Sequence, residues 1–278
     1  IDIHHAGTAM RFLTAYLCTI QRKKFILTGS KRMKERPIGV LVEALRKLGF
    51  SINYLQKNGY PPLVIQGGVS NKSTIKLRSS VSSQFISALI LIGSTFKNGL
   101  AIVLEGKIIS KPYINLTLNL LKKLGIVHSF RKNIIEIENT DRIKYSDYLI
   151  ESDWSSSSYF YSIVAINKKT SIKLGSFFRK SFQGDSILKQ IFINLGVKTN
   201  FLNENEILIS PIKNYKRPDK LSFNLIDSPD LAQTVAVTCM ALKIPAKITG
   251  LQTLKIKETD RILALYHELS KFGAKIKF

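Results

Sequence analysis

The sequence predicts an α/β protein that is divided into two domains and built from a repeated unit of helices and strands. Three features support this prediction: amphipathic helices that each end in a glycine, apolar helices that begin about 40 residues before each glycine, and strand-like stretches that follow it. The glycines are 76, 71 and 77 residues apart, so the period is near 74 residues and four copies fit the chain.

The amphipathic helices are expected in "RPIGVLVEALRKLG", "KPYINLTLNLLKKLG", "GDSILKQIFINLG" and "KETDRILALYHELSKFG", which end at Gly49, Gly125, Gly196 and Gly273. Glycine is favoured at such ends because it adopts the left-handed conformation that closes a helix. One apolar stripe is formed in the first of these helices by Ile38, Leu41, Val42, Leu45 and Leu48, and the last repeats it with Ile262, Leu265, Tyr266, Leu269 and Phe272. Strands are expected after the glycines, in "FSINYL", "IVHSF", "VKTNFL" and "AKIKF".

The apolar helices are expected in "AGTAMRFLTAYL", "SSVSSQFISALILIG", "SDWSSSSYFYSIVAI" and "SPDLAQTVAVTCMAL". Each begins with small polar residues and is apolar nearly all round, which predicts a helix that is buried on most sides. The most polar junction, "YLIESDWSSSS", separates the second copy of the unit from the third. It predicts two domains, residues 1–150 and 151–278.

Cations recur where the amphipathic helices begin, although the positive end of a helix dipole repels them. They occur, together with small hydroxyl residues, at Lys31, Arg32, Lys34 and Arg36; at Ser110 and Lys111; at Arg179, Lys180 and Ser181; and at Lys255, Lys257 and Arg261. A cation at the start of one helix alone is typical of a solvent-exposed first turn in which charged side chains pair along the helix. Recurrence in four units indicates that anions bind at these helix starts.

The net charge of +23 raises the alternative of a nucleic-acid partner. Most of the 42 basic residues are lysines scattered along the chain, whereas arginine is preferred for bidentate phosphate contacts.

No apolar run approaches the roughly 18 residues that a membrane-spanning helix needs. Cys18 and Cys239 are far apart in apolar surroundings, which predicts two buried thiols in a reducing compartment. The four histidines have no metal-ligand spacing.

Seven motifs resemble one known family: "AGTAMRFLTA", "GSKRMKERPIGVLVEALRKLG", "GYPPL", "SSVSSQFISAL", "IISKPYINLTLNLL", "PDLAQTVAV" and "KETDRILAL". They are similar to 5-enolpyruvylshikimate-3-phosphate synthases (3-phosphoshikimate 1-carboxyvinyltransferases), in order from Gly7 to the end of the chain. The resemblance implies a two-domain enolpyruvyltransferase-like fold built from βαβαββ units, of which about four of six are present. Helix N-termini of both domains converge on the active site in that family.

The resemblance also implies an activity. Members of the family are transferases of the shikimate pathway to chorismate and the aromatic amino acids. They transfer the enolpyruvyl group of phosphoenolpyruvate to the 5-hydroxyl of shikimate 3-phosphate and release phosphate, by addition and elimination, without a metal or an organic cofactor. We therefore expect a cytoplasmic monomer that binds these two small molecules, and neither nucleic acid nor a membrane.

Matching the motifs residue by residue implies the site. Shikimate 3-phosphate is expected to contact Ser82, Ser83, Gln84, Ser110, Tyr113, Asp230, Thr253 and Lys257. Phosphoenolpyruvate is expected to contact Gly7, Arg32, Gln84 and Arg261. The implied catalytic residues are Asp230, which accepts the 5-hydroxyl proton, Glu258, which protonates the enol methylene, and Lys257, which contacts the shikimate hydroxyl. Asp230 follows Pro229, a position that is also typical of a helix N-cap, and the two roles can coexist.

The chain departs from the family pattern in two places and at both ends. His5 and Thr253 stand where the family often has asparagine, although a threonine can still form a hydrogen bond there. The family's first lysine, serine and arginine cluster lies upstream of Ile1, and a further arginine and lysine lie downstream of Phe278. We therefore expect a fragment that lacks both ends and is poorly active.

Three alternatives remain. A related enolpyruvyltransferase that acts on a UDP-sugar often uses a loop cysteine, whereas Cys18 and Cys239 lie within expected helices. An RNA-binding or RNA-end-processing protein would need a histidine that accepts a nucleotidyl group, or aromatic residues that stack on bases, near the basic helix starts. A catalytically inactive remnant would keep the motifs and lack the activity.

Overall fold

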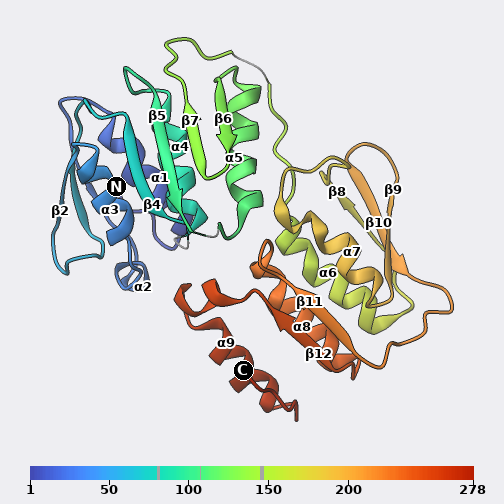
Figure 1. The fold of residues 1–278 in the computed structure, drawn as a ribbon. Helices are drawn as coiled ribbons and strands as arrows, with labels where there is room; N and C mark the ends of the chain where they lie inside the picture. Colours follow the sequence, from blue (N-terminus) through green and yellow to red (C-terminus); the bar gives the residue numbers. More distant parts are fainter. Residues whose placement is uncertain (80–81, 107, 145–146) are drawn as a thin grey trace. The chain divides into compact units, whose positions relative to one another are not determined.

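The computed structural model describes residues 1–79, 82–106, 108–144 and 147–278, which form two units, Ile1–Asp147 and Tyr148–Phe278. The sequence predicts a boundary at residue 150, three residues after the end of the first unit. Short strands and helices alternate in both units (Figure 1).

The described strands of the N-terminal unit form two sheets. The first has the antiparallel order β1 (Lys24–Leu27), β3 (Leu63–Gln66), β2 (Ser51–Tyr54). The second has the order β4 (Thr74–Arg78), β5 (Leu100–Glu105), β7 (Ile134–Ile137), β6 (His128–Arg131), in which β4 is parallel to β5 and the other pairs are antiparallel. Buried and more exposed residues alternate along β5, so one face of this sheet packs on the core.

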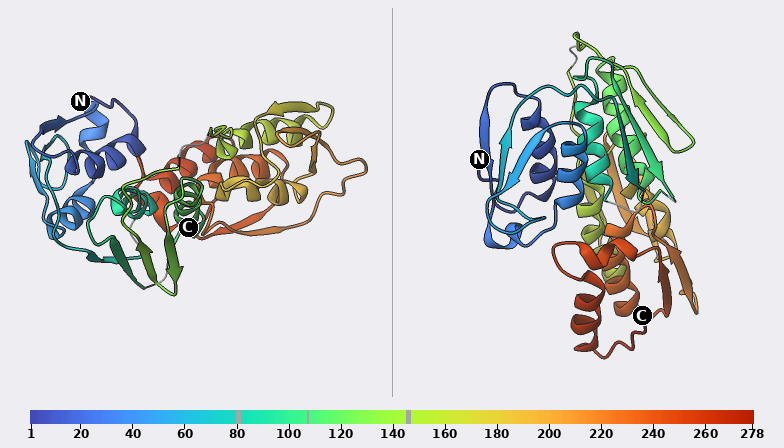
Figure 2. Two further views of the ribbon diagram at one scale, coloured as in Figure 1. Left: turned by 90° about the horizontal axis from the view of Figure 1, so that it is seen from above. Right: turned by 60° about the vertical axis from the view of Figure 1, so that its left-hand side comes forward.

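Helices cover these sheets and begin where the candidate site residues lie. Helix α1 (Gly7–Cys18) packs on α4 (Ser83–Gly93), and α4 packs on α5 (Lys111–Lys123), as Figure 2 shows. Helix α3 (Gly39–Lys47) contacts α1 and β2, and the four-residue helix α2 (Lys31–Lys34) precedes it.

The predicted stripe of α3 is confirmed. Ile38, Leu41, Val42, Leu45 and Leu48 are each at most 1% exposed. The helix ends at Lys47, and Gly49, two residues later, has a φ of +101° in the left-handed region. The next N–H, that of Phe50, returns to the Leu45 carbonyl at 3.0 Å. A regular apolar period and a glycine were enough to define this element because both act locally.

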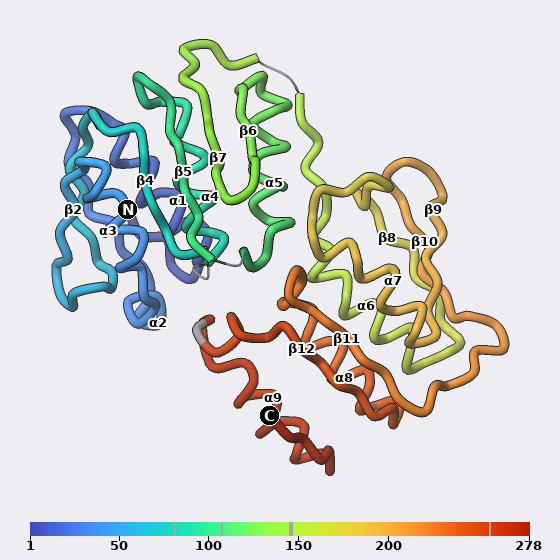
Figure 3. Tube along the Cα trace, viewed as in Figure 1, coloured from blue at the N-terminus to red at the C-terminus, as the bar shows by residue number. Residues whose placement is uncertain are grey.

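The described strands of the C-terminal unit also form two sheets. One has the antiparallel order β8 (Ile172–Gly175), β10 (Glu206–Pro211), β9 (Val197–Phe201), and the other pairs β11 (Leu221–Asn224) in parallel with β12 (Ala246–Thr249). Helix α6 (Trp154–Asn167) packs on α7 (Leu188–Ile193) and α8 (Ala232–Ala241), and α8 packs on α9 (Arg261–Ser270). Figure 3 follows this trace from α6 to α9.

The strand orders confirm the repeat. The orders β1-β3-β2, β5-β7-β6 and β8-β10-β9 are the same pattern, with the last strand of each unit between the two before it. The parallel pair β4–β5 likewise corresponds to β11–β12, and each pair is joined through an apolar helix, α4 or α8. Similar sequence units have therefore folded into similar supersecondary units.

Three expectations about single elements were wrong. Helix α6 is not buried on most sides: four of its apolar residues are exposed, Tyr159, Phe160, Ile163 and Ile166, because no described element packs on that face. The third amphipathic helix is split into a 3-10 turn, Gly184–Ile187, and the short α7. Residues 274–278 form no strand, since they pair with none of the described strands.

Both cysteines are free and buried, as predicted. Burial raises the pKa of Cys18 to about 12 and that of Cys239 to about 11, so both are protonated thiols near neutral pH. Across the described residues, no helix is both long and apolar enough to cross a membrane.

Candidate active site

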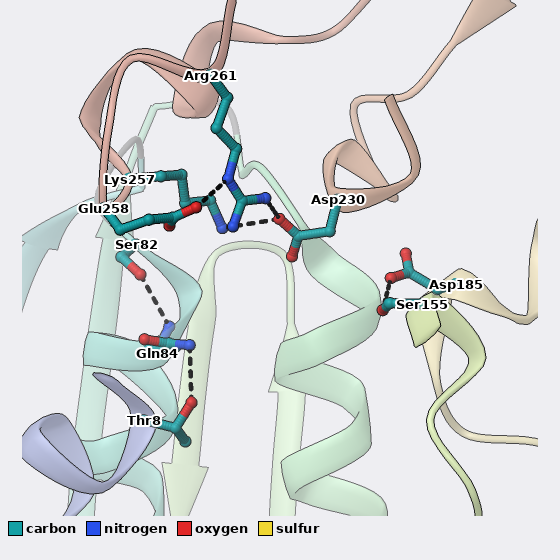
Figure 4. Close-up of polar contacts among 9 residues, drawn as sticks. All are labelled: Thr8, Ser82, Gln84, Ser155, Asp185, Asp230, Lys257, Glu258 and Arg261. Atoms are coloured by element: carbon teal, nitrogen blue, oxygen red, sulfur yellow. Dashed lines mark hydrogen bonds and ion pairs between the residues drawn. The ribbon is translucent and has the colours of Figure 1, made fainter. Parts of the chain in front are cut away.

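In the N-terminal unit, the first turns of α1 and α4 are joined by a side-chain hydrogen bond. Gly7 is the first residue of α1. Ser82 is the N-cap of α4, and its Oγ accepts from the Gln84 N–H at 3.3 Å. Gln84 Nε2 then donates to Thr8 Oγ1 at 3.0 Å (Figure 4). The structure thus brings Gly7 and Gln84 to one place, with Ser82 and Ser83 at the start of the second helix.

Arg32 lies on the short helix α2, whose N-cap is Ser30. Its Nη1 donates to Glu35 Oε2 at 2.5 Å, and with side chains 56% and 48% exposed this pair contributes little to stability. The Ser30 N–H donates to the His4 carbonyl at 3.1 Å, and Ser30 Oγ lies 3.0 Å from His5 Nδ1. The helix that carries Arg32 is therefore tied to the loop that leads into α1.

Ser110 and Tyr113 lie at the start of α5. Ser110 is the N-cap residue and is buried, with a φ of +55° that few non-glycine residues adopt, and its side chain makes no capping hydrogen bond. Tyr113 lies on the first turn, where its N–H donates to the Ser110 carbonyl at 3.1 Å. A strained backbone at a predicted ligand is consistent with a functional constraint.

In the C-terminal unit, four predicted residues form one network (Figure 4). Asp230 lies in the 3-10 turn Pro229–Leu231 before α8. Its Oδ1 accepts from Arg261 Nη1 at 2.8 Å and lies 3.2 Å from Lys257 Nζ. Arg261 Nε donates to Glu258 Oε1 at 2.6 Å. Two carboxylates are therefore held by two cations.

Helix α9 begins at Arg261 because Asp260 caps it. The Asp260 Oδ1 accepts from the N–H groups of Ile262 and Leu263 at 3.0 and 3.1 Å. Lys257 lies before the helix, in extended backbone. The two cations whose position opposes the helix dipole thus reach back to Asp230, so an anionic substrate would have to compete with carboxylates for them.

Asp230 shows no capping role in the described part of the chain. Its side chain is bound by Arg261 and Lys257 and accepts no backbone N–H.

Sequence reasoning missed the neighbouring Gln233, one turn further along the chain in α8. With its amide oriented to satisfy both contacts, Gln233 donates to the Asp230 carbonyl at 3.0 Å and accepts from Arg261 at 3.2 Å.

The network is partly buried, with side chains of Asp230 and Arg261 that are 28% and 22% exposed. Burial alone lowers the pKa of the Arg261 guanidinium, but the hydrogen bonds and charges of Glu258 and Asp230 outweigh it and raise this pKa above its ordinary value. Arg261 therefore remains a cation and keeps both carboxylates oriented.

A cleft of about 540 Å³ opens beside this network within the C-terminal unit. Its lining includes Asp230, Gln233, Glu258 and Arg261.

Thr253, in the 3-10 helix Gln252–Ile256, has a buried hydroxyl for which the described residues provide no hydrogen-bond partner. Such a hydroxyl is consistent with its predicted role as a ligand of a small molecule.

Comparison with known proteins gives a consistent result. The family model for EPSP synthase (3-phosphoshikimate 1-carboxyvinyltransferase) matches residues 1–278. A relative with that enzyme name from Bacteroides fragilis (strain YCH46) is 47% identical over 273 residues, which are 98% of this chain and 66% of the relative. Another, from Vibrio atlanticus (strain LGP32), is 36% identical over 98% of this chain and 63% of its own length. The chain thus spans slightly less than two thirds of these relatives.

Solved structures support the fold. The structure of EPSP synthase from Acinetobacter baumannii aligns with 97% of this chain, and the alignment covers 60% of the Acinetobacter chain. The TM-score is 0.68 and the sequence identity is 22%. The structure of the enolpyruvyl transferase NikO from Streptomyces tendae aligns with 79% of this chain, and the alignment covers 51% of the NikO chain. The TM-score is 0.55 and the sequence identity is 12%. The predicted two-domain α/β fold of enolpyruvyltransferases is therefore confirmed.

Proposed function

Because the chain belongs to the EPSP synthase (3-phosphoshikimate 1-carboxyvinyltransferase) family, we propose that it serves the transfer of an enolpyruvyl group from phosphoenolpyruvate to the 5-hydroxyl of shikimate 3-phosphate, with release of phosphate. The observation that carries this proposal is the network of Asp230, Lys257, Glu258 and Arg261 beside the cleft. It combines two carboxylates for proton transfer with two cations for anionic substrates.

In the proposed reaction, Asp230 accepts the proton of the 5-hydroxyl as its oxygen bonds to C2 of phosphoenolpyruvate, and protonated Glu258 gives a proton to C3. In the second step a proton returns from C3 to Glu258. At the same time the bond between C2 and the phosphate oxygen breaks, and phosphate leaves. Lys257 lies against Asp230, as a residue that contacts the shikimate hydroxyl would. General acid–base help of this kind contributes about 10²- to 10⁴-fold to the rate.

The remaining assignments belong to the same proposal. Ser82, Ser83, Gln84, Ser110, Tyr113 and Thr253 bind shikimate 3-phosphate; Gly7, Arg32, Gln84 and Arg261 bind phosphoenolpyruvate. The protein acts in the cytoplasm as a monomer on small molecules. Two free thiols are consistent with a reducing compartment.

We expect Gln84→Ala and Lys257→Ala each to weaken binding of shikimate 3-phosphate by about tenfold or more, since a hydrogen bond to a charged group contributes roughly 1.5–3 kcal/mol. Isothermal titration calorimetry measures this effect. Gln66→Ala and Lys247→Ala, which change exposed residues of β3 and β12, are the matched controls. Affinities that stay unchanged in both test variants would refute the assignment of this pocket.

Nucleic-acid binding is not expected despite the net charge of +23. Scattered lysines give a polyanion only weak attraction that falls steeply with salt. Fluorescence anisotropy with a short RNA at physiological salt should give no dissociation constant below about 1 μM, the tight end of the non-specific range. Tighter binding that depends on sequence would favour an RNA-binding function instead.

A further inference from the structure

Gln233 contacts the network of carboxylates and cations from the start of α8. It is the second residue of this helix, is partly buried and lines the cleft beside the network. Its amide oxygen accepts from Nε and Nη1 of Arg261, each at 3.2 Å, and its amide nitrogen donates to the Asp230 carbonyl at 3.0 Å. The side chain thus ties the guanidinium to the backbone of the turn that carries Asp230.

The carboxylates use the same two nitrogens of Arg261. Nε donates to Glu258 at 2.6 Å and Nη1 donates to Asp230 at 2.8 Å, whereas Nη2 has no hydrogen-bond partner in the part of the chain that the structure describes. Both carboxylates change their contacts if they act in proton transfer. Gln233 then keeps Nε and Nη1 occupied, which leaves Nη2 for an anion.

The amide adds no charge to the network. The formal charges of its members sum to zero, from the carboxylates of Asp230 and Glu258 and the cations Lys257 and Arg261. A carboxylate at position 233 would make this sum negative and would compete with an anionic ligand for Arg261. A carboxamide accepts the same hydrogen bonds without that competition.

Helix stability alone does not explain an amide at this position. The positive end of a helix dipole favours acidic residues in the first turn, and the first turn of α8 has none. A glutamate would match Gln233 in length, would gain from the dipole and would also accept from Arg261. A neutral side chain is therefore best explained by an anion that binds beside Arg261.

We propose that Gln233 is a positioning residue, which keeps the Arg261 guanidinium oriented for an anionic ligand of the cleft and holds the charge of the network at zero. Only the identity of the anion, phosphoenolpyruvate, rests on the proposed function.

Two substitutions separate this role from a purely structural one. Gln233→Met keeps the length of the side chain and removes its hydrogen bonds, whereas Gln233→Glu keeps the length and the acceptor and adds a charge. If the role were structural, Gln233→Glu would be the milder change in every measurement.

We expect the opposite order for phosphoenolpyruvate affinity, measured by isothermal titration calorimetry. The affinity should fall about tenfold in Gln233→Met, as the loss of one hydrogen bond to a charged group predicts, and further in Gln233→Glu. The midpoint of thermal unfolding should keep the structural order, with Gln233→Glu at least as stable as Gln233→Met.

Gln190→Met and Gln190→Glu, exposed changes on α7 of the same unit, are the matched controls. They should leave phosphoenolpyruvate affinity within about twofold. An unchanged affinity in Gln233→Met, or a smaller loss in Gln233→Glu than in Gln233→Met, would overturn the proposal.

A double-mutant cycle tests the contact with Arg261 without any substrate. Gln233→Met should lower the midpoint of thermal unfolding by about 2–4 °C in the wild-type protein and by much less in the Arg261→Met background. Equal shifts in the two backgrounds would refute the positioning role. If the shift depends on Arg261 and the wild-type protein does not bind phosphoenolpyruvate, the positioning role stands and the ligand named for this chain is wrong.

Discussion

Asp230→Asn is expected to lower the turnover number by at least about 10²-fold with little change in substrate affinity, because it removes the proposed proton acceptor and keeps the shape of the side chain. The structure makes the test clean, since the Asp230 side chain accepts no backbone N–H among the described residues and its loss uncaps no helix. Phosphate release from phosphoenolpyruvate and shikimate 3-phosphate measures the effect.

The matched control is Asp227→Asn, an exposed change in the same loop. It alters the local charge equally and should leave turnover within about twofold, as surface changes usually do. Near-normal turnover of Asp230→Asn would show that this carboxylate serves only to hold Lys257 and Arg261. Absent turnover in the wild-type protein would agree both with the poor activity expected of this chain and with an inactive remnant.

Glu258→Gln is expected to reduce turnover by about 10²-fold, because an amide cannot deliver a proton to C3 of phosphoenolpyruvate. In the free protein Arg261 Nε donates a hydrogen bond to Glu258 Oε1 at 2.6 Å. We therefore expect substrate to draw Arg261 away before Glu258 acts as an acid.

Exchange of solvent deuterium into the methylene of phosphoenolpyruvate reports this step separately from turnover. Glu258→Gln should suppress both, whereas Glu43→Gln, which alters an exposed pair with Arg46, should suppress neither. Loss of turnover with intact exchange would assign the C3 proton to another group.

Elements defined by local chemistry could be predicted from the sequence. The stripe of α3 and the glycine at position 49 act within a few residues, and the structure confirms both. The exposed face of α6 could not be predicted, because composition marks a helix as apolar and does not say which faces are covered. Residues 274–278 alternate like a strand, but a strand also needs a partner.

The candidate site follows the same division. The motifs gave Asp230 and Arg261, but their ion pair joins residues 31 apart in the sequence and emerges only from the fold. Gln233 was missed, although its position one turn after Asp230 was a usable signal.

The two protonated thiols make the protein suitable for site-specific labelling. With pKa values of about 12 and 11, Cys18 and Cys239 are thiolates in only about one molecule in 10⁵ and 10⁴ at pH 7. A maleimide dye, which reacts with thiolates, will therefore modify an introduced surface cysteine far faster than either native one. One dye on each unit, for example at Lys132→Cys and Lys247→Cys, would then report the distance between the units by energy transfer, without prior removal of the native cysteines.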